Sequence, residues 1–294
     1  MISGPGQLSV NEVGTKTIAT TTLLDARTVM AFASSINEDN TAYFDDTRPD
    51  GLNVHPAIAF SLQWKSRFKP DITVNERALP FGVHAYTDLK LFQPFRQGQA
   101  ITTQGQLIGR RKMAPGVYNI DRYTMTDSSG NVIAQLDYNG ITRGATLDAE
   151  DYLIADEDHP PIRESSSLTE LWRKQIDIPL CAAQQYTECA SIYNPIHTEK
   201  SVALAAGLPD IILHGSATKA IALTEIINQC FDGDSTRIKR LCGQLRAMVF
   251  MNTQIVVLCR SIIDEGNLRT VFYEVINQDN DLAIAKGVVV GDLS

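Results

Sequence analysis

Two histidines in the second half of the sequence stand where an imidazole can take part in proton transfer. The first, His197, ends an Asn-Pro-Ile-His run that begins at Asn194, and the second, His214, directly precedes Gly215. An imidazole that follows an Asn-Pro turn is held by rigid backbone, and its pKa near neutrality lets it take a proton from water and return it. The spacing predicts that His197 is a general base or acid, whereas His214 is expected to be mainly a structural residue. The alternative for His197 is a buried, hydrogen-bonded histidine in a turn.

Gly215 opens an apolar segment that predicts a long helix from about Gly215 to Cys230. The amides in the first turn of a helix have no intrahelical partner and carry the positive end of the helix dipole. The Gly215 amide is therefore a candidate oxyanion donor for a carbonyl oxygen that gains negative charge. The missing Cβ would also let a thioester approach the backbone closely, although Gly215 would equally suit a permissive helix start.

The same order of predicted elements recurs in the two halves of the chain, as in an internal duplication. In the first half a helix is predicted at 56–68, with strands at 84–92, 100–108, 117–126 and 132–141. In the second half the helix at 215–230 is followed by strands at 241–250, 254–263, 269–277 and 282–290. A helix followed by an antiparallel meander, repeated, predicts an α+β protein in which a curled sheet wraps each helix.

An acidic segment divides the two copies. Residues 148–170 hold eight acidic residues and one arginine, with a Pro pair and a Ser triplet. Such a composition buries too little apolar surface to offset its ordering entropy, so this segment is predicted to be a linker. The predicted units are an N-terminal copy at 1–147, the linker at 148–170 and a C-terminal copy at 171–294.

The first copy lacks the chemical groups of the second. When the copies are aligned, Tyr43 lies over His197 and Pro56 lies over Gly215. A phenol is a poor base at neutral pH, and proline has no N–H to donate. The first copy is therefore predicted to be catalytically silent and to shape the binding cleft. This alignment places two additional residues in the first copy just before Asn40.

Residues 186–220 resemble the hydratase 2 motif of the MaoC-like, double hot-dog family of (R)-specific enoyl-CoA hydratases and hydroxyacyl dehydratases. The resemblance implies a tandem hot-dog fold and the reversible hydration of a trans-2-enoyl thioester to the (R)-3-hydroxyacyl thioester, carried by coenzyme A or a carrier protein. It implies no metal and no cofactor. It also implies that His197 activates water, that Asn194 helps to place the water and that the Gly215 amide holds the thioester oxygen. The residues of this motif expected to bind the substrate are Tyr186, His214 and Ser216.

One position departs from the family pattern. The family carries an aspartate two residues before the asparagine, as Ser-Gly-Asp-x-Asn-Pro, and Ile192 occupies that position here. An aliphatic side chain neither accepts a proton nor orients a water. Glu188 is the first candidate to replace the aspartate, because four residues earlier in a helix it would project from the same face. It could equally be a solvated helix acid; Glu199, Asp210 and Glu38 are further candidates.

Ile192 keeps three functions open. The first is a hydro-lyase of fatty acid or polyketide metabolism, the second is a protein that binds acyl thioesters without hydrating them, and the third is an isomerase or thioesterase that uses His197 differently. The basic clusters at 109–112 and 237–240 could hold the phosphates of coenzyme A or could be solvated charges.

Composition limits the partners, metal sites and cellular location that can be expected. The chain holds 26 Lys and Arg against 34 Asp and Glu, a formal net charge of −8, so neither nucleic acid nor an anionic membrane is an expected partner. Five cysteines without C-x-x-C spacing indicate reduced thiols rather than a zinc site. No run reaches the roughly 18 apolar residues of a spanning helix, and no signal peptide is evident at the N-terminus. A soluble, cytoplasmic or otherwise intracellular homodimer is expected.

Overall fold

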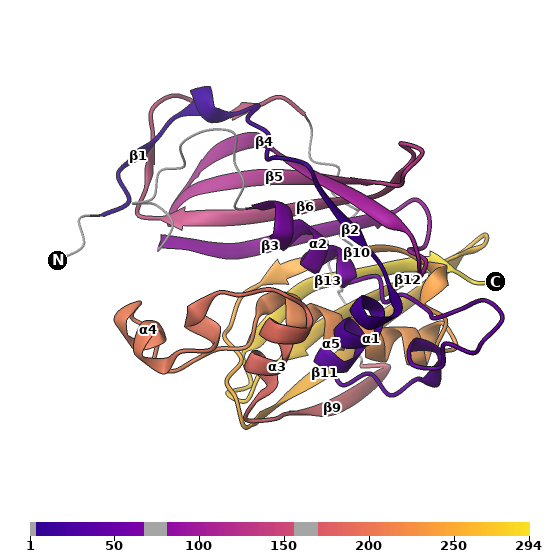
Figure 1. Ribbon diagram of the computed structural model, residues 1–294. Coiled ribbons are helices and arrows are strands. Elements are labelled where there is room, and N and C mark those ends of the chain that lie inside the picture. The colour runs from indigo at the N-terminus through magenta and orange to yellow at the C-terminus, as the bar shows by residue number, and fades with distance from the viewer. Residues whose placement is uncertain (1–3, 68–80, 156–169) are drawn as a thin grey trace.

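The two halves of the chain share one antiparallel sheet (Figure 1). The computed structural model describes residues 4–67, 81–155 and 170–294. The strands of the first half are β2 (Thr20–Leu23), β3 (Gly82–Leu91), β4 (Ala100–Met113), β5 (Gly116–Thr126), β6 (Val132–Arg143) and β8 (Tyr152–Leu153). The strands of the second half are β9 (Trp172–Ile178), β10 (Ile238–Leu245), β11 (Thr253–Glu265), β12 (Leu268–Ile276) and β13 (Leu282–Asp292). A separate parallel pair is formed by β1 (Gln7–Leu8) and β7 (Thr146–Leu147).

The strand order repeats in the two halves. It is β2-β4-β5-β6-β3 in the first half and β10-β13-β12-β11-β9 in the second, with β3 paired to β10 at the junction and β8 added beside β4. The predicted plain meander is therefore wrong in one respect. The first strand after each helix pairs with the last strand of its copy, β3 with β6 and β10 with β13. This arrangement brings β3 and β10 to the middle, where they join the copies.

Two of the α-helices, α2 and α5, pack on this sheet (Figure 1). The α-helices of the described chain are α1 (Ala26–Ser35), α2 (Ile58–Arg67), α3 (Ala182–Cys189), α4 (Lys200–Ala205) and α5 (Gly215–Cys230), with short 3-10 helices η1 (Val10–Glu12), η2 (Thr41–Tyr43), η4 (Pro195–His197) and η5 (Ser235–Arg237). The prediction for α5 is confirmed at both ends. The helix α2 packs on strands β2, β4 and β6, and α5 packs on β10, β12 and β13. Phe68, the predicted end of the first helix, lies outside the described residues.

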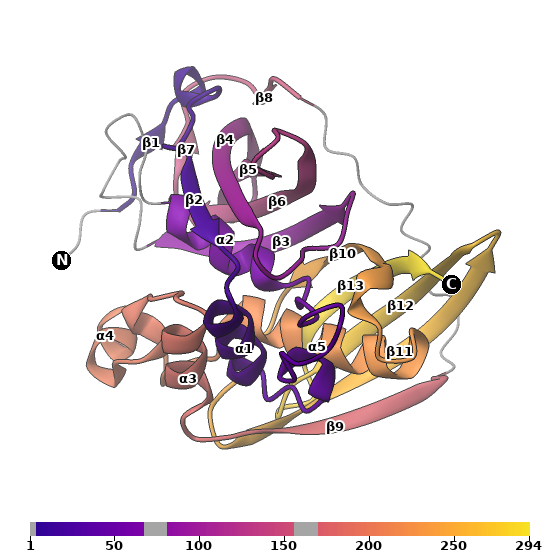
Figure 2. The same cartoon turned by 45° about the vertical axis from the view of Figure 1, so that its right-hand side comes forward.

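The two copies also share one hydrophobic core. A single cluster of buried side chains includes Phe60 of α2, Leu136 of β6, Leu223 of α5 and Val257 of β11. Figure 2 shows α1 of the first copy beside α3 of the second, and these helices are in contact. The shared sheet, core and helix contact fix the position of one copy relative to the other. The α+β fold with two helix-on-sheet copies is the one predicted.

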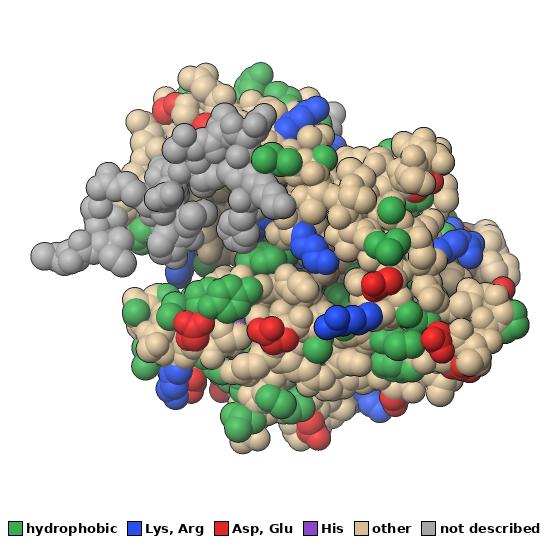
Figure 3. Space-filling model, viewed as in Figure 1, with side chains coloured by type: hydrophobic (Ala, Val, Ile, Leu, Met, Phe, Trp, Pro, Cys, Tyr) green, Lys and Arg blue, Asp and Glu red, His purple; other side chains and the backbone are tan. Residues whose placement is uncertain are grey.

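The segment after the first copy is partly described. Within the predicted linker at 148–170, Tyr152 and Leu153 form β8 and pair with Arg110 and Gly109 of β4, while residues 156–169 lie outside the described part. The boundaries of the linker stay a prediction. On the face shown in Figure 3, acidic and basic side chains are interspersed. In the described ranges no helix is both long and apolar enough to cross a membrane.

Backbone geometry aligns the two copies without an insertion. Asn37 and Ser191 both follow a helix and have positive φ values, 54° and 56°. The next residues, Glu38 and Ile192, each donate their amide to the carbonyl five residues earlier, at 3.1 and 3.0 Å. Ile192 is therefore the counterpart of Glu38, and the predicted two-residue insertion before Asn40 is wrong. The first copy thus has an acid, Glu38, at the position where the second copy has Ile192.

Candidate active site

The imidazole of His197 is oriented by a backbone carbonyl. Its Nδ1 lies 2.7 Å from the carbonyl oxygen of Ile212. Because a carbonyl only accepts, Nδ1 carries the proton, and Nε2 is left with a free lone pair. Burial lowers the pKa of His197 to about 4, against the opposing effect of the Ile212 bond. The ring is therefore neutral at neutral pH and can act as a base through Nε2.

His214 holds the ring of His197 in place. The two rings stack with centroids 3.7 Å apart and an interplanar angle of 28°. His214 is 3% exposed, and its Nε2 lies 3.1 Å from the carbonyl oxygen of Ile192 and 3.3 Å from Oγ1 of Thr187. Burial, and next the neighbouring His197, keep the pKa of His214 well below its ordinary value. His214 thus joins α3, the turn that follows it and the start of α5.

Gly215 is the first residue of α5, and its Cα faces the side chain of Leu245. The first backbone bond of the helix runs from the Thr218 amide to the His214 carbonyl at 3.0 Å, so the Gly215 amide precedes the bonded turns. A Cβ at Gly215 would collide with the side chain of Leu245 on β10. The structure therefore gives a packing reason for the glycine. The prediction was that the missing Cβ lets a thioester approach this Cα, whereas the space beside the Cα is occupied by Leu245.

Tyr186 and Ser216 flank the same helix start. Tyr186 lies on α3 and is completely buried, with its ring centroid 5.0 Å from that of His214. Its hydroxyl, which lies beside Ser216, has no hydrogen bond of normal geometry in the described chain. Ser216 is 6% exposed. Three of the residues predicted to bind substrate, Tyr186, His214 and Ser216, are thus brought together.

Asn194 begins the short helix that carries His197. Its Oδ1 accepts a long bond of 3.5 Å from the Ile196 amide, and Pro195 follows at the first helical position. This cap fixes the backbone of η4 and so the direction in which His197 leaves it. The geometry gives Asn194 a positioning role, and its share in placing a water stays a prediction.

The prediction that Glu188 shares a face with Ile192 is wrong. The helix α3 ends at Cys189, and the positive φ of Ser191 turns the chain before Ile192. Glu188 is exposed, whereas Ile192 is 4% exposed and packs in the core. The helical spacing used for the prediction therefore does not extend to Ile192.

The other predicted carboxylates have different partners. Glu199 accepts the hydroxyl of Tyr193 at 2.5 Å, and Asp210 pairs with Lys200 at 2.8 Å. Glu38 of the first copy accepts the hydroxyl of Thr224 on α5 of the second copy, at 3.2 Å. Thr224 follows Gly215 by nine residues, which is about 14 Å along the helix. Within the described chain, the hydrogen bond of the His197 side chain goes to a backbone carbonyl and to none of these acids.

The equivalent position in the first copy lacks a base. Tyr43 ends η2 as His197 ends η4, but it is 1% exposed and burial raises the pKa of its phenol. His55, the counterpart of His214, accepts the Ala57 amide through Nδ1 at 3.2 Å and contacts Thr224 through Nε2 at 3.3 Å. These contacts fasten the start of α2. They support the prediction that the first copy is silent.

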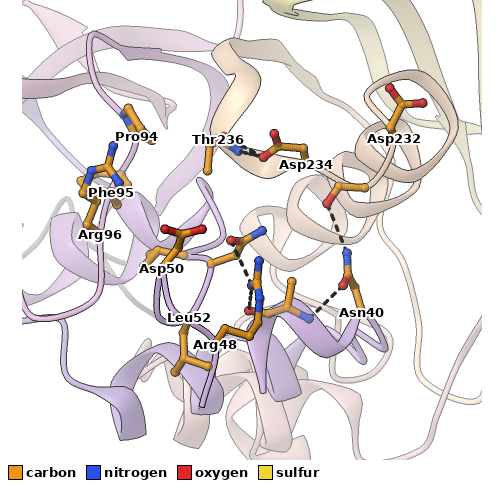
Figure 4. A pocket seen from close by; sticks show the side chains of 14 residues that line it. Asn40, Arg48, Asp50, Leu52, Pro94, Phe95, Arg96, Asp232, Asp234 and Thr236 are labelled. Carbon is orange, nitrogen blue, oxygen red and sulfur yellow. Dashed lines mark hydrogen bonds between the residues drawn. The ribbon is translucent and has the colours of Figure 1, made fainter. Parts of the chain in front are cut away.

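A pocket of about 530 Å³ opens at the first copy's η2 helix, beside Asn40 (Figure 4). Its wall includes Arg48, which donates to the Ala42 carbonyl at 2.9 Å and to Asn53 at 3.3 Å. The Asn40 amide reaches the carbonyl of Gly233, just beyond the end of α5. Because the 16 residues of α5 span about 24 Å, this pocket is remote from His197 at the other end.

Sequence reasoning missed the carbonyl of Ile212, because a backbone group leaves no mark in the residue types. The two basic clusters also have partners within the chain. Arg110 pairs with Glu12 at 2.5 Å and Arg240 with Asp88 at 2.5 Å. These contacts favour a structural role for the clusters over the binding of coenzyme A phosphates.

Each copy matches a family of known proteins. Residues 172–271 match the family model described as MaoC like domain, and residues 11–136 match the one described as FAS1-like, dehydratase domain region. A segment of 102 residues is 31% identical to the peroxisomal enoyl-CoA hydratase 2 of Arabidopsis thaliana. The match covers 35% of this chain and 32% of that protein, so the chain spans about a third of the plant enzyme.

Solved structures share the whole fold. A MaoC-like dehydratase from Phytophthora capsici is 18% identical, with a TM-score of 0.81 over 98% of this chain and 100% of that one. A hypothetical protein from Mycobacterium tuberculosis, described as a double hotdog fold, is 12% identical, with a TM-score of 0.63 over 95% of this chain and 96% of the other. Each half of the chain therefore matches a dehydratase-type family model, MaoC like domain in the second half and FAS1-like, dehydratase domain region in the first, and the chain has the double hot-dog fold.

Proposed function

We propose that the chain catalyses the reversible hydration of a trans-2-enoyl thioester to the (R)-3-hydroxyacyl thioester. The observation that carries this proposal is the neutral His197 with a free Nε2, placed beside the start of α5. The match of residues 172–271 to the MaoC like domain and the name of the plant relative, an enoyl-CoA hydratase, support the same reaction. Coenzyme A or a carrier protein would carry the acyl group.

In the hydration direction His197 acts first as a base. Its Nε2 accepts a proton from water while the water oxygen forms a bond to C3 of the enoyl group. The electron pair of the double bond moves toward the thioester, whose oxygen becomes negative. The Gly215 amide, at the positive end of the α5 dipole, donates to that oxygen. Tyr186 and Ser216 border the thioester.

The same imidazole then acts as an acid. The imidazolium returns its proton to C2 as the thioester carbonyl re-forms, so the elements of water add to one face of the double bond. A single acid–base group is sufficient for this balance, which suits a chain with Ile192 at the position of the family aspartate. Asn194 positions His197 and helps to place the water.

The test is loss of enoyl absorbance with crotonyl-CoA and a longer trans-2-enoyl-CoA. His197→Gln is expected to lower kcat by about 10² to 10⁴-fold, the usual contribution of general acid–base catalysis. Tyr43→Phe, at the equivalent position of the first copy, is the matched control and is expected to retain activity. Equal turnover by His197→Gln and the unmodified chain would exclude His197 as the acid–base group.

A second function, acyl-thioester binding without hydration, is favoured by Ile192, which provides no carboxylate. It predicts that both enoyl substrates bind and that neither loses its absorbance. Release of free thiol in the same assay would indicate thioesterase activity instead.

A further inference from the structure

The inner face of the first-copy sheet changes from apolar to polar along its strands. Leu89 of β3 pairs with Leu136 of β6, which pairs with Tyr123 of β5, and all three are in the core cluster. Two residues along the same face, Thr87 pairs with Tyr138. On β5 the same step leads from Tyr123 to Asp121. The row beyond the core thus carries a hydroxyl, a phenol and a carboxylate.

The first-copy helix ends where this polar row begins. Arg67, the last residue of α2, places its guanidinium carbon 5.5 Å from the ring centroid of Tyr138. Gln63 lies one turn earlier on the same side of the helix, beside Tyr123. It is 1% exposed, and its amide nitrogen has no hydrogen-bond partner in the described chain. A buried donor without a partner is costly unless a ligand or a water satisfies it.

His84 adds an acceptor to the row. Its ring stacks on Tyr138 with centroids 3.6 Å apart, and its Nε2 lies 2.8 Å from the Thr87 hydroxyl and 3.1 Å from the Tyr86 carbonyl. Burial, with help from Lys219 and Arg67, keeps the pKa of His84 well below its ordinary value, so the ring is neutral. With Nε2 donating to the carbonyl, Nδ1 has a lone pair available.

Asp121 offers a second acceptor. Burial raises the pKa of Asp121 to about 6, against the opposing charges of Arg67 and Arg110. In the part of the chain that the structure describes, no hydrogen bond or ion pair is recorded for its carboxylate. Asp121, Tyr138 and His84 all keep partial solvent-accessible surface although burial dominates their pKa shifts. These three side chains are thus half-buried, in an environment that disfavours charge.

The polar row reaches the candidate active site through α5. Lys219, one turn after Gly215, is completely buried and donates to the Gly243 carbonyl at 2.7 Å. Gly243 of β10 pairs with Thr87 of β3 at the junction of the copies. The row therefore extends from the first turn of α5 across the sheet junction to Asp121. A chain attached to a thioester at Gly215 would meet this row.

We propose that this row, formed by Gln63, His84, Asp121 and Tyr138, binds an acyl chain that bears hydroxyl groups. The inference rests on the proposed function for the position of the thioester. A hydroxyl group both donates and accepts: it can donate to Asp121 or His84 and accept from the Gln63 amide. A plain hydrocarbon chain would displace water from these groups and leave them unpaired, and a site built for hydrogen bonding discriminates strongly against such an analogue.

The test is binding of two saturated thioesters, octanoyl-CoA and octanoyl-CoA with a hydroxyl group near the end of the chain, by calorimetry. The hydroxylated ligand is expected to bind at least about tenfold more tightly. Asp121→Leu is expected to reduce or reverse this preference, and Asp121→Asn, which retains a hydrogen-bonding group, is expected to keep most of it. Equal or tighter binding of octanoyl-CoA by the unmodified chain would overturn the inference.

Saturated ligands cannot be hydrated, so this measurement is independent of the proposed reaction. Hydration of crotonyl-CoA without a preference for the hydroxylated ligand would refute the polar row alone. A clear preference in a chain that hydrates neither crotonyl-CoA nor a longer enoyl-CoA would refute the hydratase proposal alone. Asp121→Asn guards against a misfolded Asp121→Leu variant, and both are checked by their far-UV circular dichroism.

Discussion

At the scale of single residues, the chemistry of this chain depends on which atom orients its histidine. A carboxylate partner would stabilise an imidazolium, whereas the Ile212 carbonyl fixes the ring and leaves burial as the dominant influence on its pKa. Because the pKa of His197 is low, about 4, its ring is neutral and able to accept a proton over a wide pH range.

The pH dependence of kcat/KM tests this arrangement. Because kcat/KM reports ionisation in the free enzyme, its value with crotonyl-CoA is expected to stay nearly constant from pH 8 to about 5. Activity is expected to fall as the pH drops through about 4, where His197 gains a proton and loses its basic Nε2. A decline centred near the ordinary histidine pKa of about 6.5 would contradict the burial of the ring.

The role of Gly215 can be separated into packing and catalysis. Gly215→Ala is expected to destabilise the chain by about 1 to 3 kcal/mol, as overpacking does, because the new methyl group meets Leu245. It is also expected to lower kcat by shifting the start of α5. The double variant Gly215→Ala, Leu245→Ala keeps the amide and removes the collision, so activity is expected to recover. Thermal unfolding and turnover are measured for the single and double variants together; stability that recovers without activity would show that the Cα itself faces the substrate.

At the scale of elements, hydrophobic periodicity was sufficient to predict α5 and most of the strands. The segment from Gly215 to Cys230 has a helix-compatible composition with an apolar run at its centre, so both ends could be predicted. The short helix α1 was not predicted, and a helix at Glu188 was assumed only in order to place that residue. Pairing of β3 with β6 depends on contacts distant in sequence, which local periodicity does not report.

The register between the copies was misread for a local reason. The turn after α1 uses Asn37 and the turn after α3 uses Ser191, both with positive φ, and neither is the glycine that marks such a turn. Once these residues are aligned, Glu38 of the first copy stands opposite Ile192 of the second. An acid and a histidine at equivalent turns are thus divided between the copies, with Glu38 in the first and His197 in the second. Residue types alone did not show that Glu38 is the counterpart of Ile192.

The start of α2 provides a prediction about acid stability. Burial lowers the pKa of His55 to about 3, so the unfolded chain binds a proton at this residue between about pH 6.5 and 3 while the folded chain does not. The free energy of unfolding therefore falls as the pH falls through that range. His55→Asn keeps an acceptor for the Ala57 amide and removes the titration.

The comparison is made by urea unfolding at pH 7 and pH 5. The unmodified chain is expected to lose about 2 kcal/mol more than His55→Asn over this interval. Loss of the Thr224 contact changes the variant's stability equally at both pH values and cancels in the difference. Equal losses of the free energy of unfolding in the two proteins would mean that His55 has the same pKa in the folded and in the unfolded chain.

At the scale of the whole molecule, the net charge comes mainly from residues 148–170, and the two copies form one structural unit. Outside residues 148–170 the chain holds 25 basic and 26 acidic residues, so the folded body is nearly neutral. The two copies share a sheet and a core, which makes them one cooperative unit rather than two domains on a tether. The sequence showed the duplication, but no sequence pattern showed that β3 and β10 would pair.

The ion pair between Asp88 and Arg240 tests this cooperativity, because it joins β3 to β10. Asp88 is 3% exposed and accepts two bonds from the guanidinium, with Arg240 Nε at 2.8 Å from Oδ1. Asp88→Asn removes the carboxylate that pairs with Arg240, a side chain only 16% exposed, so it is expected to lower the free energy of unfolding by about 3 to 5 kcal/mol. Replacement of both partners, Asp88→Leu with Arg240→Met, is expected to recover most of that loss.

The chain offers an internal reporter for each copy in this experiment. It has two tryptophans, Trp64 in the first copy and Trp172 in the second, so Trp64→Phe and Trp172→Phe each leave one fluorescent probe. Because the copies share the β3–β10 pairing, both probes are expected to report the same urea midpoint, and Asp88→Asn is expected to shift the two midpoints equally. Separate midpoints, or a shift confined to one probe, would mean that the copies unfold independently and that the pairing of β3 with β10 contributes little to holding them together.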